Sequence, residues 1–262
     1  IKALQYFSNS LKIYKEIEYI KGESHMLTSI GNVYLYIQNF DLALEYYQRA
    51  LSIIENTDIP QRRIAVIYMN IGETNDELKK YKESKIYYEK ALKIIEVTSD
   101  KFFLVSCYAP LSKIHLALNE IEEASNYAKK MNTISIELNV SSFITEGQII
   151  SAELDLKKGN IEAALKMGES ILAGLDKNSD NELKLNLYDL LYKIYQADNN
   201  PKKSLEMYQQ YSIYKDSVQL ERNKLTLIRE VVKIEFDDLL LKNEQKIQKE
   251  KTEAELKYQQ KT

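Results

Sequence analysis

The stretch "SIGNVYLYIQNFDLALEYYQRAL", residues 29–51, decides the fold because it returns later in the chain. Residues 70–92 read "NIGETNDELKKYKESKIYYEKAL", with Ile-Gly, a small residue, a Tyr-Tyr pair and Ala-Leu in the same order. A recurrence at this interval indicates one structural unit that is used several times rather than a single globular core.

The unit is marked by a small residue that is followed, four positions later, by an aromatic residue or its replacement. The six pairs are Ala3/Phe7, Ala43/Tyr47, Ser84/Tyr88, Ala124/Ala128, Ala164/Gly168 and Ser204/Tyr208, and successive pairs are 40, 41, 40, 40 and 40 residues apart. Residues at i and i+4 share one helix face, so the small residue allows a neighbouring helix to approach and the aromatic fills the space beside it.

A second amphipathic segment precedes five of these pairs. It is clearest as Leu27/Ile30/Gly31/Tyr34, Tyr68/Ile71/Gly72 and Tyr188/Leu191/Tyr192/Tyr195. Short polar links such as "IQNF" (37–40) and "ADNN" (197–200) join the two segments. Each unit is therefore predicted to be a helix, a tight turn and an antiparallel helix, and stacked units bury an apolar face that one unit cannot bury alone.

This pattern resembles the tetratricopeptide repeat family over roughly residues 1–214. The best match to the family motif is Leu27, Ile30, Gly31, Tyr34, Ala43, Tyr47 and Ala50. Later units depart from the motif, with Asn75 and His115 in place of a Tyr and Pro201 in place of a turn aromatic. The period also exceeds the usual length of about 34 residues, which predicts longer helices.

The resemblance implies an all-α fold, a right-handed superhelical solenoid of about five and a half repeats over residues 1–214. Residues 1–17 read as a second helix without its first helix. A solenoid end without a cap exposes apolar surface, so we expect further repeats to precede Ile1.

Residues 215–262 are predicted to form one long, coiled-coil-like C-terminal helix that first caps the array and then acts as a connector. One apolar stripe consists of Leu220, Leu227, Ile234 and Leu241, and a second stripe consists of Leu225, Ile228, Val232, Phe236 and Leu239. Two apolar faces require two partners. We expect one stripe to cap the last repeat, and the second to join two copies in a homodimer or to connect to a downstream module.

Repeats that lead into such a helix resemble the sensor region of membrane-anchored bacterial signalling proteins, of the histidine kinase or DNA-binding regulator type. The resemblance implies an array on the extracytoplasmic side, with a cytoplasmic location as the alternative. It also implies that any membrane contact is made by a segment downstream of these residues.

Composition narrows the classes of partner. The net charge of −3, with acidic and basic residues mixed, argues against direct nucleic-acid binding. Cys107, the one cysteine, lies in an apolar helical segment and is predicted to be an inert core thiol. The two histidines lack ligand-spaced partners, and no catalytic motif is visible, so we predict no metal, no cofactor and no enzymatic activity.

By the resemblance, certain first-helix positions face a concave groove that binds a protein or peptide. These positions hold Thr28, Asn32, Tyr36, Met69, Glu73, Asp76, Glu77, Lys113, Glu153, Asp189 and Lys193. Glu73, Asp76 and Glu77 are predicted to form an acidic patch. The alternative is an ordinary solvated helix face. A clamp for a C-terminal carboxylate is disfavoured, because only Asn32 occupies one of the clamp positions of the family.

Two other functions remain open from the sequence. One is a phosphatase of response regulators that is controlled by a peptide. Such phosphatases are also built from long tetratricopeptide repeats, and they need an N-terminal helical bundle for activity. The other is a plain adaptor that holds proteins together without a signalling output.

Overall fold

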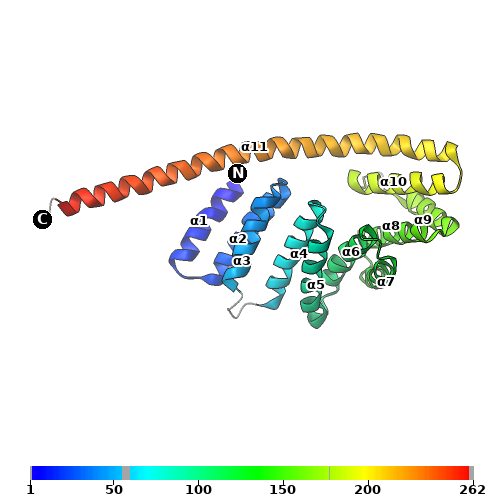
Figure 1. Cartoon of the computed structure of the whole chain (residues 1–262), viewed down its shortest axis with the longest axis horizontal. Helices are drawn as coiled ribbons and strands as arrows, with labels where there is room; N and C mark the ends of the chain where they lie inside the picture. The colour runs from blue at the N-terminus through cyan, green and yellow to red at the C-terminus, as the bar shows by residue number, and fades with distance from the viewer. Residues whose placement is uncertain (1, 55–59, 177, 260–262) are drawn as a thin grey trace.

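The computed structural model describes residues 2–54, 60–176 and 178–259, with side chains as far as Glu235. All regular structure within these ranges is helical (Figure 1). The helices are α1 (Lys2–Glu16), α2 (Ile20–Tyr36), α3 (Phe40–Ile54), α4 (Gln61–Glu77), α5 (Tyr81–Thr98), α6 (Lys101–Ala117), α7 (Ile121–Leu138), α8 (Ser141–Lys158), α9 (Ile161–Gly174), α10 (Asn181–Ala197) and α11 (Pro201–Gln259).

The helices pack as consecutive antiparallel pairs that form an arc (Figure 1). The pairs are α2/α3, α4/α5, α6/α7, α8/α9 and α10 with the first part of α11, while α1 packs on α2. Successive first helices also contact one another, from α2 to α4, α6, α8 and α10. This arrangement confirms the predicted helical solenoid, in which the first helices form a continuous inner layer.

The turn inside each pair has the same geometry. Gln38, Lys79, Asn119, Gly159 and Asn199 all have a positive φ between 54° and 81°. After each of them, a backbone N–H donates to a carbonyl five residues earlier, as from Asn39 to Tyr34 and from Asn200 to Tyr195. A left-handed residue with such a bond ends a helix and satisfies its last carbonyls. The recurrence of this turn confirms that the repeat extends well beyond the two best-matching units.

Glycine and aromatic residues fix the close approach of the two helices in a pair. A Cβ atom on Gly31 would lie 2.5 Å from the ring of Tyr47, and one on Gly72 would lie 2.8 Å from the ring of Tyr88. The Ser84 hydroxyl donates to the carbonyl of Gly72 at 2.7 Å. The predicted roles of the small and aromatic positions are thus confirmed in these units.

The core is a chain of clusters along the arc rather than one centre. A first cluster joins α1–α4 around Leu27, Ile30 and Tyr47, and a second joins α4–α8 around Leu111 and Met131. Smaller clusters continue through α8, α9 and α10. Stability therefore depends on neighbouring pairs, as it does in other solenoids.

The unusual residues of α6 have packing roles. The helix continues through Pro110 to Ala117. His115 is 3% exposed, and its ring stacks on that of Tyr127 with the centroids 5.3 Å apart. Cys107 is fully buried, and burial raises the pKa of its thiol to about 12. Both residues thus belong to the core, as predicted for Cys107.

Helix α11 does not leave the array as a free rod. It begins as the partner of α10, passes without a break through the expected boundary at residues 214/215, and crosses the arc toward the first helices (Figure 1). Val232 is 3% exposed and belongs to the core cluster that includes Leu4 and Ile37. The Arg229 Nη1 donates to the Gln38 carbonyl at 3.4 Å. The C-terminal helix therefore touches both ends of the solenoid.

The described side chains of the two apolar stripes of α11 differ from the expectation. Leu225 is half-buried and Val232 is buried against the chain's own solenoid, whereas Ile228 is 47% exposed. Phe236 and Leu239, predicted for the same stripe, and Leu241 lie outside the described side chains. In the other stripe Leu220, Leu227 and Ile234 are 56%, 69% and 67% exposed. The reason is the path of α11, which runs back along the array. The chain's own first repeats therefore cover the face of α11 that was expected to bind a second copy.

Candidate partner-binding groove

The inner layer of the arc begins with an amide contact between two repeats. The side chain of Asn32 on α2 accepts two hydrogen bonds through Oδ1, each of 2.8 Å, from the Tyr47 hydroxyl and from Asn70 Nδ2 on α4. This arrangement holds Asn32 between α2, α3 and α4. Its position is therefore fixed by the same helix packing that builds the repeats.

One turn further along α4, three carboxyl groups gather at the inner layer. Glu73 and Glu77 are exposed and Asp76 is half-buried, but the pKa of Glu73 is raised, first by partial desolvation beside the neighbouring helices and then by repulsion from Glu77 and Asp76. The pKa of Asp76 is also raised by poor solvation, although the positive charge of Lys113 on α6 opposes this. The predicted acidic patch is thus present in the structure, and its charges are incompletely compensated.

The pKa of Glu77 is raised by poor solvation as well, and the charges that act on it come partly from distant parts of the chain. Arg222 on α11 lowers this pKa, while Glu182 on α10 and Asp76 raise it. Poor solvation and then Glu73 also raise the pKa values of the buried Tyr47 and Tyr88 hydroxyls. The acidic patch therefore acts on groups of α3 and α5, and charges of α10 and α11 act on it.

The remaining predicted positions make their direct contacts outside this patch, although the charge of Lys113 acts on Asp76. Lys113 pairs with Glu146 on α8, and Asp189 pairs with Lys193 within α10. The Thr28 hydroxyl donates to the Ser24 carbonyl of its own helix at 2.9 Å.

Two further predicted residues differ in their surroundings. Met69 packs at the edge of the second core cluster, and Glu153 is half-buried on α8. The structure therefore brings together Asn32, Tyr36, Glu73, Asp76 and Glu77, which occupy the inner layer of the first two repeats.

A cavity of about 230 Å³ lies where α11 crosses this part of the inner layer. Its lining residues are Leu35, Tyr36, Gln38, Phe40, Glu73, Glu77, Asp180, Glu182, Val218, Glu221, Arg222 and Leu225. Residues from α2, α4, α10 and α11 thus meet at one place, although they are up to 190 positions apart in sequence.

Reasoning from the sequence missed the residues that α10 and α11 contribute to this cavity. Arg222 donates to Glu182 Oε1 at 3.1 Å, and Asn181 Nδ2 donates to Glu221 Oε1 at 2.9 Å. A signal was present in the spacing of Val218, Arg222 and Leu225, which places them on one helix face. The sequence does not show that this face turns toward the groove.

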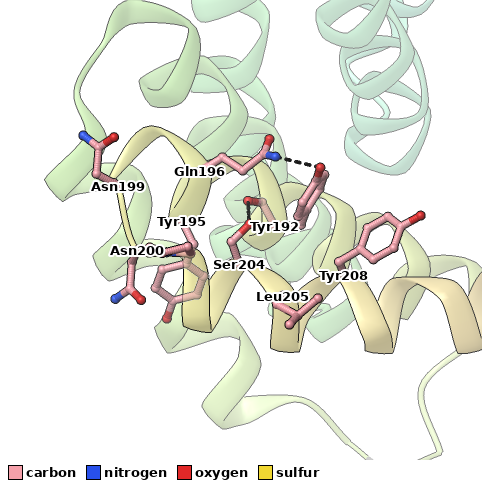
Figure 2. Close-up of a pocket in the computed structure, with 9 residues that line it drawn as sticks. Tyr192, Tyr195, Gln196, Asn199, Asn200, Ser204, Leu205 and Tyr208 are labelled. Atoms are coloured by element: carbon pink, nitrogen blue, oxygen red, sulfur yellow. Dashed lines mark hydrogen bonds between the residues drawn. The ribbon is translucent and has the colours of Figure 1, made fainter.

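A larger cavity of about 650 Å³ lies at the outer end of the last pair, between α10 and α11 (Figure 2). Its walls carry Tyr192, Tyr195, Leu205 and Tyr208, with Asn199, Asn200 and Gln196 at the turn. Leu205 and Tyr208 are 57% and 46% exposed. In a stacked array the next first helix would occupy such a position, so this cavity is the uncovered end face of the solenoid.

The described residues contain neither a candidate metal site nor a helix suited to span a membrane. Within residues 2–54, 60–176 and 178–235, no three His, Cys, Asp or Glu side chains are grouped so that they could hold a metal ion. None of the helices in the described part of the chain is both long and apolar enough to cross a membrane.

Comparison with known proteins agrees with the repeat assignment. The sequence profile of the tetratricopeptide repeat matches residues 22–96. Human outer dynein arm-docking complex subunit 4 is 22% identical over 151 residues, which are 56% of this chain and 22% of that protein. Response regulator aspartate phosphatase I of Bacillus subtilis is 31% identical over 102 residues, which are 38% of this chain and 26% of that protein. The chain spans about a quarter of the length of these relatives.

Solved structures share the fold over most of the chain. BtubC (BKLC) from P. vanneervenii superimposes with a TM-score of 0.65 at 17% identity, covering 83% of this chain and 91% of that chain. The Rap conjugation gene regulator of plasmid pLS20, solved in complex with the Phr* peptide, gives a TM-score of 0.64 at 14% identity, covering 83% of this chain and 60% of that chain. At this identity the likeness shows the fold alone, a solenoid of paired helices.

Proposed function

We propose that this tetratricopeptide-repeat solenoid is a non-enzymatic scaffold that binds a protein or peptide segment along the groove lined by α2, α4 and α6. The observation that carries the proposal is the cluster of Glu73, Asp76 and Glu77, whose pKa values are raised at the inner layer. Carboxylates that are poorly solvated and repel one another are stabilised by an added positive charge. A segment with Lys or Arg side chains therefore fits this surface best.

The groove also provides contacts of other kinds beside the acidic patch. Tyr36 is 68% exposed next to it, and the amides of Asn32 and Asn70 lie one turn away along the inner layer. An exposed aromatic ring supplies apolar contact area, and amides can bond to an extended backbone. These groups favour a peptide ligand over a lone cation.

The partner can be sought with a random 12-residue peptide library displayed on phage and selected on the whole chain. We expect enriched peptides to be basic and to lose at least about tenfold in affinity when Glu73→Gln and Asp76→Asn are combined. Glu83→Gln, an exposed change on α5, is the matched control and should change affinity less than about twofold. Enriched peptides that bind the groove variant as well as the natural chain would show that this surface is not the site.

We further infer that the array is the sensing or interaction region of a bacterial signal-transduction protein. The match to a Bacillus response regulator phosphatase and the fold shared with a peptide-bound Rap regulator support this role. The exposed stripe at Leu220, Leu227 and Ile234 offers a place for a homodimer contact on α11. Sedimentation of the whole chain tests the dimer, and a monomer at every concentration would remove that part of the proposal.

The same relative favours a second function, in which the array takes the control peptide of a response regulator phosphatase. The catalytic groups would then belong to a part of the protein outside these residues. The rate of dephosphorylation of a phosphorylated response regulator by the full-length gene product tests this alternative. An unchanged phosphorylation half-life would exclude it and leave the adaptor role.

A further inference from the structure

The path of α11 across the groove is the starting point for a further inference, which rests on the proposed function. Between Val218 and Leu225, α11 lies over the cavity whose other walls are formed by α2, α4 and α10. A segment of the same chain therefore already borders the groove face that would receive a partner, while the side chains of Tyr36, Glu73 and Glu77 remain exposed beside it.

Charge indicates why this segment fits the groove. The cavity lining contains five carboxylates and one cation: Glu73, Glu77, Asp180, Glu182 and Glu221 against Arg222. Arg222 bonds to Glu182 and also acts on Glu77, so it lies between α4 and α10. Another basic residue of this region, Lys184, has its Nζ 5.5 Å from the ring of Tyr214. The lining thus has an excess of negative charge that a single guanidinium only partly offsets.

The far end of the covering segment is held by a small contact. Arg229 reaches the carbonyl of Gln38 at 3.4 Å, and Val232 enters the first core cluster. Burial of one valine and one hydrogen bond contribute a few kcal/mol at most. This contact, which we call the latch, is therefore weak enough to open.

We propose that residues 218–232 of α11 are the resting occupant of the groove, and that a cationic partner segment displaces them by taking the place of Arg222. The latch at Arg229 and Val232 determines how readily a partner segment displaces residues 218–232. Because the covering helix is tethered, it competes at a high effective concentration, and an external segment binds more weakly than it would to an open groove.

The test uses the whole chain and a fluorescein-labelled peptide with the sequence of residues 214–235, "YKDSVQLERNKLTLIREVVKIE", in fluorescence anisotropy. Val232→Asp places a charge in the core cluster and should release the latch. Its matched control is Val231→Asp, because Val231 is the adjacent residue and is 49% exposed. Arg229→Ala is a milder latch variant that removes only the hydrogen bond and does not threaten the fold.

We expect the peptide to bind both latch variants at least about tenfold more tightly than it binds the natural chain or Val231→Asp. A peptide with Arg222→Glu should bind the latch variants at least about tenfold more weakly than the natural peptide. Equal affinity for all four proteins would overturn the covering role of α11. Equal affinity of the two peptides would overturn the role of the cation.

The phage-selected peptides in the same assay separate this inference from the proposed function. If they bind the natural chain and Val232→Asp equally, the groove is a partner site and the covering role of α11 is wrong. If they bind neither protein while the 214–235 peptide responds to the latch, α11 covers the groove but the groove does not serve an external partner.

Discussion

Gly31 and Tyr47 show how single residues set the distance between the two helices of a repeat. The ring of Tyr47 lies directly on the backbone of Gly31, and its hydroxyl continues to Asn32 in the groove. One contact thus sets the distance between α2 and α3 and also orients a side chain of the inner layer. The same relation holds between Gly72 and Tyr88 in the next pair.

We predict that Gly31→Ala destabilises the fold by about 1–3 kcal/mol, because the new Cβ would overlap a ring that cannot move freely in a packed core. Urea unfolding followed by circular dichroism measures the change. Gly174→Ala is the control, since a Cβ atom there meets nothing within 4 Å, and it should leave stability unchanged or slightly raised. Equal effects of the two changes would contradict the packing role of Gly31.

The raised pKa of Glu73 predicts a pH-dependent effect of Glu73→Gln. The folded chain holds this proton more tightly than the unfolded chain, so the native state is favoured at low pH and loses that advantage as the pH rises through the raised pKa. The substitution should therefore raise the free energy of unfolding at about pH 7, by less than about 1 kcal/mol because of solvent screening, and change it little at about pH 4. A loss of stability at the higher pH would show that Glu73 is favourably paired.

The Cys107 thiol should resist alkylation in the native state. Its pKa is raised to about 12 by burial, so the reactive thiolate is scarce near neutral pH. We expect iodoacetamide to modify Cys107 at about pH 8 only after denaturation, as measured by mass spectrometry. Rapid modification of the folded chain would place Cys107 outside the core.

At the scale of elements, the turns between paired helices are the recurrent feature. Lys79 adopts a φ of 57° at the turn between α4 and α5. Gly159 occupies the equivalent position at the turn of a later pair. A left-handed conformation costs a residue with a Cβ about 1–2 kcal/mol. This strain is present at several turns and is outweighed by the packing of the helices.

Lys79→Gly should therefore stabilise the chain by up to about 1 kcal/mol. Lys82→Gly lies inside α5 and should instead destabilise it by about 1 kcal/mol, through lost helix propensity. Thermal unfolding of the two variants compares the effects directly. A lower melting temperature for Lys79→Gly would mean that the turn needs the lysine side chain.

The latch of α11 should control local opening of that helix. In Val232→Asp, amide hydrogens of residues 225–235 should exchange at least about tenfold faster than in the natural chain, because local opening no longer breaks a buried contact. Val231→Asp should leave their exchange unchanged. Mass spectrometry of the exchanged peptides reads the difference, and fast exchange in the natural chain would show that the latch does not form.

The repeat was predictable from sequence because its signals are local. Residues such as Ala43 and Tyr47 lie four positions apart, and the turn residues recur at nearly constant intervals. The acidic patch was also predictable, since Glu73, Asp76 and Glu77 lie on neighbouring turns of one helix.

The path of α11 was not predictable, because the contact of Arg229 with Gln38 joins residues 191 positions apart. An apolar stripe shows that a helix face needs a partner, but its spacing does not identify that partner. The amphipathic pattern of Leu225 and Val232 fits a second copy of the chain as well as it fits the chain's own first repeats. Only the curvature of the whole arc brings those repeats within reach.

At the scale of the whole molecule, the arc of helix pairs and α11 form a closed arrangement (Figure 1). The last pair begins α11, and α11 ends its described contacts on the first repeats. We therefore expect a change in curvature to strain the latch, and release of the latch to free the curvature. Under the proposal, a partner in the groove would act on both, which would link binding to the part of α11 that follows the latch.

The distance between α11 and the first repeats tests this account most directly, by pulsed electron paramagnetic resonance with spin labels at Asp41→Cys and Lys233→Cys. Both positions are exposed, and the buried Cys107 should remain unlabelled. Each label lies about one helical turn from a latch residue, so we predict one narrow peak below about 30 Å. This peak should move to longer, broader distances in Val232→Asp. A broad, long distribution in the natural chain, unchanged by Val232→Asp, would contradict the closed arrangement.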